Sequence, residues 1–254
     1  DHRLADRSVI ELAELADEML SLTGEQFAMV AATLDDDDLA MVERAIAYRT
    51  GEGWRTDPLS MAAHLTGGKT KAWKYSRLLG QQFVKAVEGE SKRQIWNLPA
   101  RYGKTTVSSQ WGPVWMLDRY PHLKVILTSY GDKLAKENAG TVRDLLDEHH
   151  DVLRVAVRQD RRARGGWRTS EGGMVLAAGV GSTMTGYGGD VIVVDDPFKN
   201  WVEAHSETTR ESVWNWYRSV VRTRLQTDDS AIIVVMTRWH EDDLAGRLLD
   251  LAAS

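Results

Sequence analysis

The apolar run that ends at Asp195 constrains the fold more than any other part of the chain. Val191-Ile192-Val193-Val194 is followed directly by Asp195-Asp196 and then by Pro197. A strand with β-branched side chains on both faces has to be covered on both faces, as strands at the centre of a parallel sheet are. Because parallel strands are joined by crossover connections, usually helices, this run predicts an α/β fold.

The sequence after Lys92 extends this pattern. Short apolar runs alternate with segments of helical composition, which is typical of a mostly parallel sheet flanked by helices. We predict strands at residues 94–98, 125–130, 174–178, 191–195 and 231–237. We predict helices at residues 105–118, 133–148 and 203–225. Gly165-Gly166 and Gly172-Gly173 bracket a short segment, which indicates a hairpin there.

The N-terminal part has a different character. It is acidic and rich in Ala, Leu, Glu and Met, and its apolar residues have helical spacing. The run Asp35 to Asp38 is predicted to cap a helix beginning near Leu39 rather than to bind a metal. A glycine-containing stretch at residues 50–58 precedes a second helical segment at residues 61–88. We therefore expect a helical N-terminal region at residues 1–58 and one α/β domain at residues 59–254.

Composition excludes several classes of protein. The 254 residues include no cysteine, so disulfides, thiolate metal sites and a cysteine nucleophile are excluded. No apolar run approaches the roughly 20 residues that cross a bilayer, and the first residues are too charged for a signal peptide. We therefore expect a soluble, intracellular protein that does not contact membranes.

The charge of the chain bears on contacts with nucleic acid. The net charge of −5 argues against a protein that coats nucleic acid over its whole surface, so any DNA contact is expected to be local. One arginine cluster is a candidate for that contact, with a solvated charged loop as the alternative. It consists of Arg154, Arg158, Arg161, Arg162, Arg164 and Arg168.

Two Gly-Lys-Thr triplets are candidates for a phosphate-binding loop. Such a loop needs a buried strand before it and a helix after it, because backbone N–H groups at the helix start face the phosphates. Gly68-Lys69-Thr70 follows a segment of helix-forming residues, whereas Gly103-Lys104-Thr105 follows the predicted strand at residues 94–98. We therefore assign the loop to the second triplet. Leu98 stands where the general motif has its first glycine, so the motif is only partly satisfied.

The residues of this loop suit nucleotide binding. Lys104 would place its ammonium on the β and γ phosphates, Thr105 would offer its hydroxyl to Mg²⁺, and Arg101 would add positive charge near the γ phosphate. A basic loop that only caps a strand is the alternative. The predicted nucleotide-binding set is Pro99, Ala100, Arg101, Tyr102, Gly103, Lys104, Thr105 and Thr106.

Two predicted strands end in polar residues that complete this site. At the carboxyl end of such a strand, Asp195 is predicted to hold Mg²⁺ and Asp196 to orient and deprotonate water. A strand ending in an Asp-Asp-Pro turn is the alternative. Thr237, at the next strand end, is a candidate γ-phosphate sensor. Residues 241–243 are acidic and are predicted to begin a helix, and a lone histidine, His240, is expected to be satisfied by local hydrogen bonds rather than to bind a metal.

Three motifs together resemble those of phage large terminase subunits. They are residues 99–105, residues 191–197 with Asp-Asp-Pro, and residues 237–248, which begin Thr-Arg-Trp-His-Glu-Asp-Asp-Leu. The resemblance covers roughly residues 75–249. It implies a P-loop NTPase core of the additional-strand, RecA-like type, with ATP and Mg²⁺ as cofactors and Thr237 as a coupling residue. It also implies a C-terminal nuclease domain, which we expect to be absent from this chain.

The family implies the partners as well. These are double-stranded DNA, a portal protein, a small terminase subunit and further copies of the chain in a ring, a pentamer when assembled and a monomer in isolation. The implied location is the host cytoplasm, docked on a procapsid. The implied function is an ATPase motor that moves DNA into the procapsid. The alternatives are another RecA-like motor of helicase type, and a catalytically weak DNA-binding or assembly module.

Two departures from the family pattern bear on catalysis. Asp196 stands where many relatives have the longer glutamate, which implies either a closer water or slower hydrolysis. Tyr187 stands where many relatives have an arginine that acts on the neighbouring subunit's nucleotide. An arginine finger contributes about 10³ to 10⁵ in rate, so we expect another residue to supply it. The candidates are Arg101 in cis, and Arg224 or the part of the arginine cluster from Arg158 to Arg168 in trans.

Overall fold

The computed structural model describes residues 9–184 and 186–253. The chain divides into two compact units, the first ending at Thr56 and the second beginning at Asp57. Within the described residues the first unit is helical, with a small core that includes Leu12, Met19 and Val42. Its elements are α1 (Val9–Met19), α2 (Gly24–Ala31), α3 (Asp36–Arg49) and a 3-10 turn, η1 (Gly53–Arg55).

The predicted cap in the first unit is confirmed. The Asp35 side chain accepts a hydrogen bond from the Asp38 backbone N–H at 2.8 Å, as a residue at a helix N-terminus does. The helix α3 begins at Asp36, three residues before the predicted start. The acidic run therefore stabilises the N-terminus of α3, and most of its residues lie within that helix.

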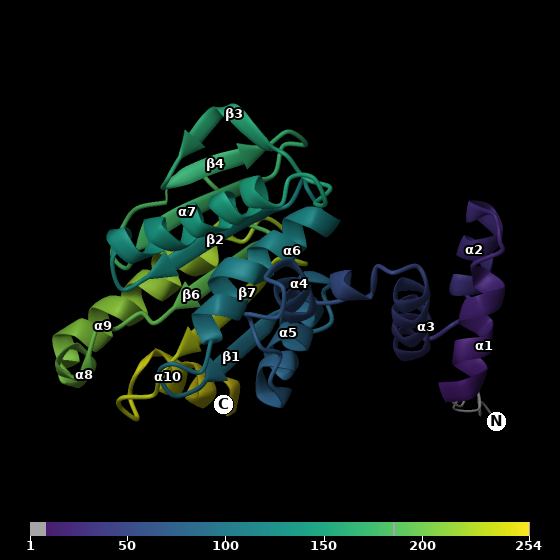
Figure 1. Ribbon diagram of the computed structural model, residues 1–254. Helices are drawn as coiled ribbons and strands as arrows, with labels where there is room; N and C mark the ends of the chain where they lie inside the picture. The colour runs from purple at the N-terminus through teal and green to yellow at the C-terminus, as the bar shows by residue number, and fades with distance from the viewer. Residues whose placement is uncertain (1–8, 185, 254) are drawn as a thin grey trace. The chain divides into compact units, whose positions relative to one another are not determined.

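The second unit is built on a seven-stranded sheet with the order β1-β7-β6-β2-β5-β4-β3. The first five strands in that order are parallel, and β4 and β3 continue the sheet as antiparallel strands (Figure 1). Their bounds are β1 Arg93–Asn97, β2 Lys124–Ser129, β3 Val157–Ala163, β4 Gly166–Thr169, β5 Met174–Gly179, β6 Val191–Asp195 and β7 Ala231–Met236. The predicted α/β class and all five predicted strands are confirmed, and β7 is the additional strand between β1 and β6.

Helices cover both faces of the sheet. One face packs on α5 (Lys74–Val87), a π-helical turn η2 (Thr106–Trp111), α6 (Gly112–Arg119) and α7 (Asp132–Glu148), as Figure 1 shows. The other face packs on α9 (Glu207–Trp216), a second π turn η3 (Tyr217–Val221) and α10 (Leu244–Ala253). Every residue of β6 and β7 is buried, as a strand covered on both faces requires. Trp216 of α9 and Tyr217 of η3 lie in this core, so these two aromatic side chains serve packing.

Two segments that were each predicted to form one helix are divided in the structure. Residues 61–88 form two helices, α4 (Pro58–Leu65) and α5, because Gly67 and Gly68 adopt positive φ angles of 60° and 80° after α4. Residues 203–225 are divided at Ser206, whose hydroxyl accepts from the Thr209 N–H at 3.3 Å and so caps α9. The first part is the short α8 (Trp201–His205), and a 3-10 turn, η4 (Arg222–Arg224), ends the second.

The arginine cluster lies largely on the β3–β4 hairpin rather than in a loop. Arg158 forms an ion pair with Asp160 at 2.7 Å, and Arg162 forms one with Asp147 of α7. These acids neutralise two of the cationic groups, which weakens the case for a basic DNA-binding surface there. Among the described residues, no helix is both long enough and apolar enough to span a membrane.

Candidate functional site

The site lies where three parallel strands end at one edge of the sheet. Asn97, the last residue of β1, is paired in register with Met236 of β7. Asp195, the last residue of β6, is paired with Val235 of β7. Because β7 lies between β1 and β6, the residues that follow all three strands meet at this edge. Edges of this kind are where open α/β sheets bind ligands.

The loop after β1 has the backbone of a tight turn. Arg101 and Gly103 have positive φ angles of 69° and 71°, and the helical run begins at Lys104. The Val107 N–H donates to the Gly103 carbonyl at 3.1 Å, which closes the first helical turn. A left-handed backbone costs a non-glycine residue roughly 1–3 kcal/mol, so Arg101 is strained here. Such strained turns at a helix start form concave sites for anions.

Lys104 joins the loop to the other two strand ends. Its side chain is only 6% exposed, and its Nζ lies 3.2 Å from Asp196 Oδ2. The same Nζ donates to Thr237 Oγ1 at 3.2 Å, and this hydroxyl donates to the Leu98 carbonyl at 3.1 Å. Three of the residues predicted from separate motifs, Lys104, Asp196 and Thr237, are therefore in direct contact.

Asp196 is held in an unusual conformation. Its φ is 45°, in the left-handed region that aspartate tolerates better than most residues. The Tyr130 N–H donates to its carbonyl at 3.1 Å, and its own N–H donates to the Val235 carbonyl at 2.8 Å. The Thr237 N–H donates to Asp196 Oδ1 at 3.2 Å. These contacts fix the carboxylate beside Lys104 while leaving its side chain 34% exposed, so a ligand or water can reach it.

Asp195 is buried beneath this pair. The Ser109 hydroxyl donates to its Oδ2 at 2.8 Å, whereas its Oδ1 has no hydrogen-bond partner among the described residues. Burial, followed by the charge of Asp196, raises the pKa of Asp195 to about 6, although Ser109, Thr105 and Lys104 act in the opposite direction. A buried carboxylate oxygen without a partner is costly unless it binds a cation or a donor.

These residues fit a Mg²⁺ ion bound together with a nucleotide. The donor set is Asp195 Oδ1, which no described residue hydrogen-bonds, and the hydroxyl of Thr105, both hard oxygen ligands of the kind Mg²⁺ prefers. No group of three or more His, Cys, Asp or Glu side chains that could hold a metal occurs in the described part of the chain. A site with few protein ligands is usual for Mg²⁺, which keeps waters and takes phosphate oxygens as its other ligands.

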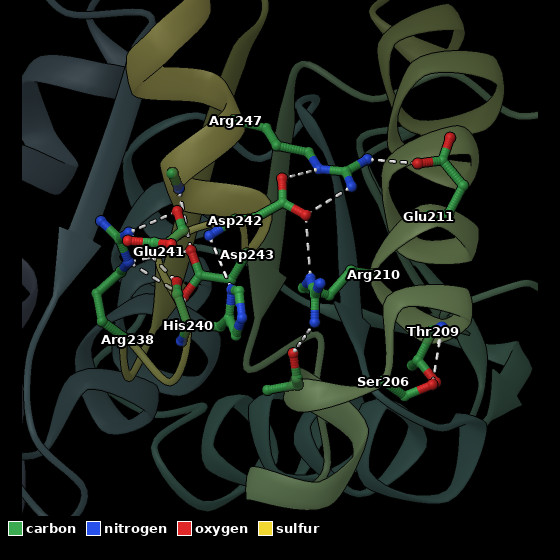
Figure 2. A network of polar contacts seen from close by, with 12 residues as sticks. Ser206, Thr209, Arg210, Glu211, Arg238, His240, Glu241, Asp242, Asp243 and Arg247 are labelled. Atoms are coloured by element: carbon green, nitrogen blue, oxygen red, sulfur yellow. Dashed lines mark hydrogen bonds and ion pairs between the residues drawn. The ribbon is translucent and has the colours of Figure 1, made fainter.

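The segment that follows β7 is held by two aspartates (Figure 2). Asp243 is fully buried and accepts from the Gly246 N–H at 3.0 Å, so it caps α10. It also accepts from the Arg238 guanidinium and from the Trp239 N–H, at 3.1 and 3.3 Å. The predicted helix start is therefore confirmed in kind, but α10 begins at Leu244, after the acids rather than at them.

Asp242 connects this segment to α9 and α10. In Figure 2 its carboxylate lies between two guanidinium groups: Arg247 donates to both oxygens at 2.7 and 2.9 Å, and Arg210 donates to Oδ2 at 3.1 Å. Hydrogen bonds from Arg247, and then from Arg210, lower the pKa of Asp242 to about 2. His240 accepts the Asp242 N–H at its Nδ1 at 3.0 Å, which confirms that local hydrogen bonds satisfy this histidine.

The other predicted residues do not take part in the contacts among Lys104, Asp196 and Thr237. Pro99, Ala100, Arg101 and Tyr102 are exposed in the loop, and Thr106 is half-buried at the start of η2. Arg224 donates to the Met184 carbonyl at 3.3 Å. Gly68-Lys69-Thr70 follows the helix α4 rather than a strand, as predicted for the rejected triplet.

Two features of the site were missed in the sequence. Ser109 is one of many serines, and nothing in its spacing showed that it reaches Asp195. The Tyr102 ring lies 5.4 Å from the Tyr75 ring of α5, which places an exposed aromatic pair beside the loop. A contact between residues so far apart in the chain has no local signal.

The comparison with protein families decides what this arrangement belongs to. The family described as "Terminase large subunit, T4likevirus-type, N-terminal" matches residues 95–252, more than half of the chain. The chain belongs to this terminase family. A search of curated proteins gives no match.

Two solved structures are similar to this terminase chain. The large terminase of bacteriophage HK97 is 12% identical with a TM-score of 0.44, and the match covers 68% of this chain and 36% of that one. The large terminase of the thermophilic bacteriophage D6E, in complex with ADP, is 13% identical with a TM-score of 0.38, covering 61% and 38%. The chain thus spans well under two thirds of either relative.

Proposed function

We propose that this chain is the ATP-hydrolysing motor of a DNA-packaging terminase, with residues 59–254 as the motor domain and residues 1–58 as a helical N-terminal region. The observation that supports this most directly is the contact of Lys104 with both Asp196 and Thr237 at 3.2 Å. It brings a cation, a candidate base and a hydroxyl sensor to one edge of the sheet. A basic loop that only capped a strand would not need the other two groups.

Each residue has a role in this proposal. The loop from Pro99 to Thr106 cradles the phosphates, and Lys104 moves from Asp196 to the β and γ phosphates when ATP binds. Asp196 is then free to accept a proton from the attacking water, and Thr237 responds to the position of Lys104. Arg101 approaches the γ phosphate. Thr105 and Asp195 would hold Mg²⁺, which would supply positive charge beside the phosphate oxygens.

The partners follow from the family. The proposed substrate track is double-stranded DNA, and the proposed protein partners are a portal protein, a small terminase subunit and further copies of this chain in a ring. The proposed location is the host cytoplasm, at the procapsid. A trans-acting arginine is proposed to come from Arg224 or the arginine cluster, because Tyr187 occupies the position at which many relatives have one.

Phosphate release from ATP, with and without double-stranded DNA, tests the proposal. We expect Lys104→Ala and Asp196→Asn each to lower hydrolysis by at least about 100-fold, since each removes a charged group from the transition state. Lys69→Ala is the matched control, because Lys69 stands in the same Gly-Lys-Thr context but follows a helix. Hydrolysis that does not depend on Lys104, with or without DNA, would contradict the motor assignment and favour a DNA-binding or assembly module.

A further inference from the structure

Ser109 makes a buried contact that the proposed mechanism does not use. Its hydroxyl lies 2.8 Å from Asp195 Oδ2, and the two residues are 1% and 2% exposed. The other carboxylate oxygen, Oδ1, is also buried and has no partner among the described residues. One oxygen of Asp195 is therefore committed to the protein, and the other is left for a ligand.

The direction of the hydrogen bonds follows from the chemistry of the groups. An ionised carboxylate can only accept, so Ser109 donates its single hydroxyl proton to Asp195. The hydroxyl of Ser108 lies 3.1 Å from that of Ser109 and must then be the donor of that pair. The two serines form a short chain, Ser108 to Ser109 to Asp195, in which each hydroxyl is oriented by the next acceptor.

The local sequence explains why two neighbouring serines both face the core. They lie in η2, where the Gly112 N–H bonds the Val107 carbonyl, five residues back instead of four. Pro113 has no N–H, and in a regular α-helix its ring would clash with the carbonyl of Ser109. Widening to a π turn relieves that clash, and π turns of this kind often occur at functional sites.

Gly112 permits the same turn to pack closely. A Cβ at this position would lie 2.6 Å from both the Phe83 ring and the Val107 carbonyl. The glycine and the proline that follows it therefore specify the wider turn together. The backbone of the π turn therefore determines where the Ser109 side chain lies.

We propose that Ser109 is a positioning residue for the metal-binding carboxylate. By holding Oδ2 of Asp195, it fixes the carboxylate so that Oδ1 stays available to a divalent cation bound with the nucleotide. This inference rests on the proposed nucleotide site. Groups that hydrogen-bond to a metal ligand, and so orient it, typically contribute about 10- to 100-fold to metal affinity. An effect of Ser109 on metal affinity is therefore measurable.

Serines around Asp195 offer a matched series of substitutions. Ser109→Ala removes the donor to Asp195, and Ser108→Ala removes only the donor to Ser109. Ser129→Ala is the control, because Ser129 is also fully buried and is paired in register with Asp195, yet its hydroxyl has no partner among the described residues. All three changes remove one buried oxygen, and only one of them removes a bond to the carboxylate.

Two binding measurements test the proposal without relying on turnover. Binding of ADP in the presence of EDTA measures the phosphate loop alone, and binding of Mn²⁺ to the ADP complex, followed by electron paramagnetic resonance, measures the cation site. We expect Ser109→Ala to weaken Mn²⁺ binding by about 10-fold. Metal-free ADP binding is expected to stay unchanged. Ser108→Ala should have a smaller effect on Mn²⁺, Ser129→Ala should have none, and Ser109→Thr should retain most of the affinity.

The possible outcomes separate the two levels of the argument. If wild type binds Mn²⁺ and ADP but Ser109→Ala binds Mn²⁺ equally well, the positioning role is wrong and the motor proposal stands. If Ser109→Ala weakens metal-free ADP binding as much as it weakens Mn²⁺ binding, the serine supports the fold rather than the cation, which also overturns the inference. If wild type binds no ADP in either condition, the proposed function itself fails.

Discussion

The two ends of the segment after β7 differ in how completely the charged groups around them are hydrogen-bonded. At the Thr237 end, Lys104 is shared between a hydroxyl and a strained Asp196, and one oxygen of Asp195 has no partner in the part of the chain that the structure describes. At the other end, both oxygens of Asp242 and of Asp243 are hydrogen-bonded, as Figure 2 shows. Burial alone does not account for the difference, since Asp195 and Asp243 are both buried and only Asp243 has both oxygens hydrogen-bonded among the described residues.

This contrast teaches which end is built to change. Polar groups that are fully hydrogen-bonded hold one structure and lose much when one member is removed. Polar groups left with unused capacity are costly in the folded state and are kept where a ligand completes them. Substitutions at the Asp242 and Asp243 end should therefore lower stability, whereas substitutions at the Thr237 end should lower activity.

The largest effect is expected for Asp243→Ala. The change removes the acceptor of the buried Gly246 N–H, of the part-buried Trp239 N–H and of Arg238 Nε. Loss of a buried charged acceptor of this kind costs about 3–4 kcal/mol in the free energy of unfolding. Urea denaturation measures it, with Asp250→Ala, an exposed aspartate of α10, as the control. A loss below about 1 kcal/mol would show that water replaces the carboxylate and that the network does not hold this segment.

Thr237→Val should have the opposite profile. The valine has the same shape but neither accepts from Lys104 nor donates to the Leu98 carbonyl. We expect ATP hydrolysis to fall about 100-fold, which is equivalent to about 2.7 kcal/mol in the transition state, while the free energy of unfolding changes by about 1 kcal/mol or less. Phosphate release and urea denaturation are compared on the same preparations. Thr208→Val, on the exposed side of α9, is the control.

A parallel loss of activity and stability in Thr237→Val would remove the distinction between the two ends. Activity that stays close to wild type would instead show that the hydroxyl does not sense Lys104. Binding of ADP, expected within about threefold of wild type, separates a defect in hydrolysis from a defect in affinity.

The sequence was sufficient for the fold class because its strongest signals are local. The Val-Ile-Val-Val run before Asp195 could only be a strand covered on both faces, and β6 is such a strand. Lys104, the proposed phosphate-loop lysine, was distinguished from Lys69 by the strand before it, which is again a local pattern. The prediction of one long helix at residues 203–225 was wrong at Ser206. The cap formed by this side chain outweighed the helical composition of the segment.

Only part of the site could be predicted from the sequence, for a related reason. Lys104, Asp196 and Thr237 could be predicted because strand ends in a parallel sheet meet at one edge, whatever the details of packing. Ser109 could not, because its position depends on a π turn that Gly112 and Pro113 impose between two ordinary helical segments. The pairing of Asp242 with Arg210 joins residues 32 positions apart and depends on how α9 and α10 pack.

The smallest expected effect concerns the pH dependence of stability at Asp242. Hydrogen bonds from Arg247 and Arg210 lower its pKa to about 2 in the folded protein, against about 3.9 in an unfolded chain. A depressed carboxyl pKa contributes stability above the unfolded value, and this contribution is lost as the pH falls from about 4 towards about 2. Since 42% of the Asp242 side chain is exposed, solvent screening reduces the contribution to about 1 kcal/mol.

Urea denaturation at a series of pH values from 6 down to about 3 isolates this contribution. We expect wild type to exceed Asp242→Asn by about 1 kcal/mol at the upper end and by progressively less below about pH 4, because protonation removes the charge that the substitution also removes. Titration of all other groups cancels in the difference. Asp228→Asn, at an exposed aspartate before β7, is the control for the substitution itself. A difference at Asp242 that stays constant with pH would mean that packing of the guanidinium groups, and not the charge of the carboxylate, holds α9 to α10.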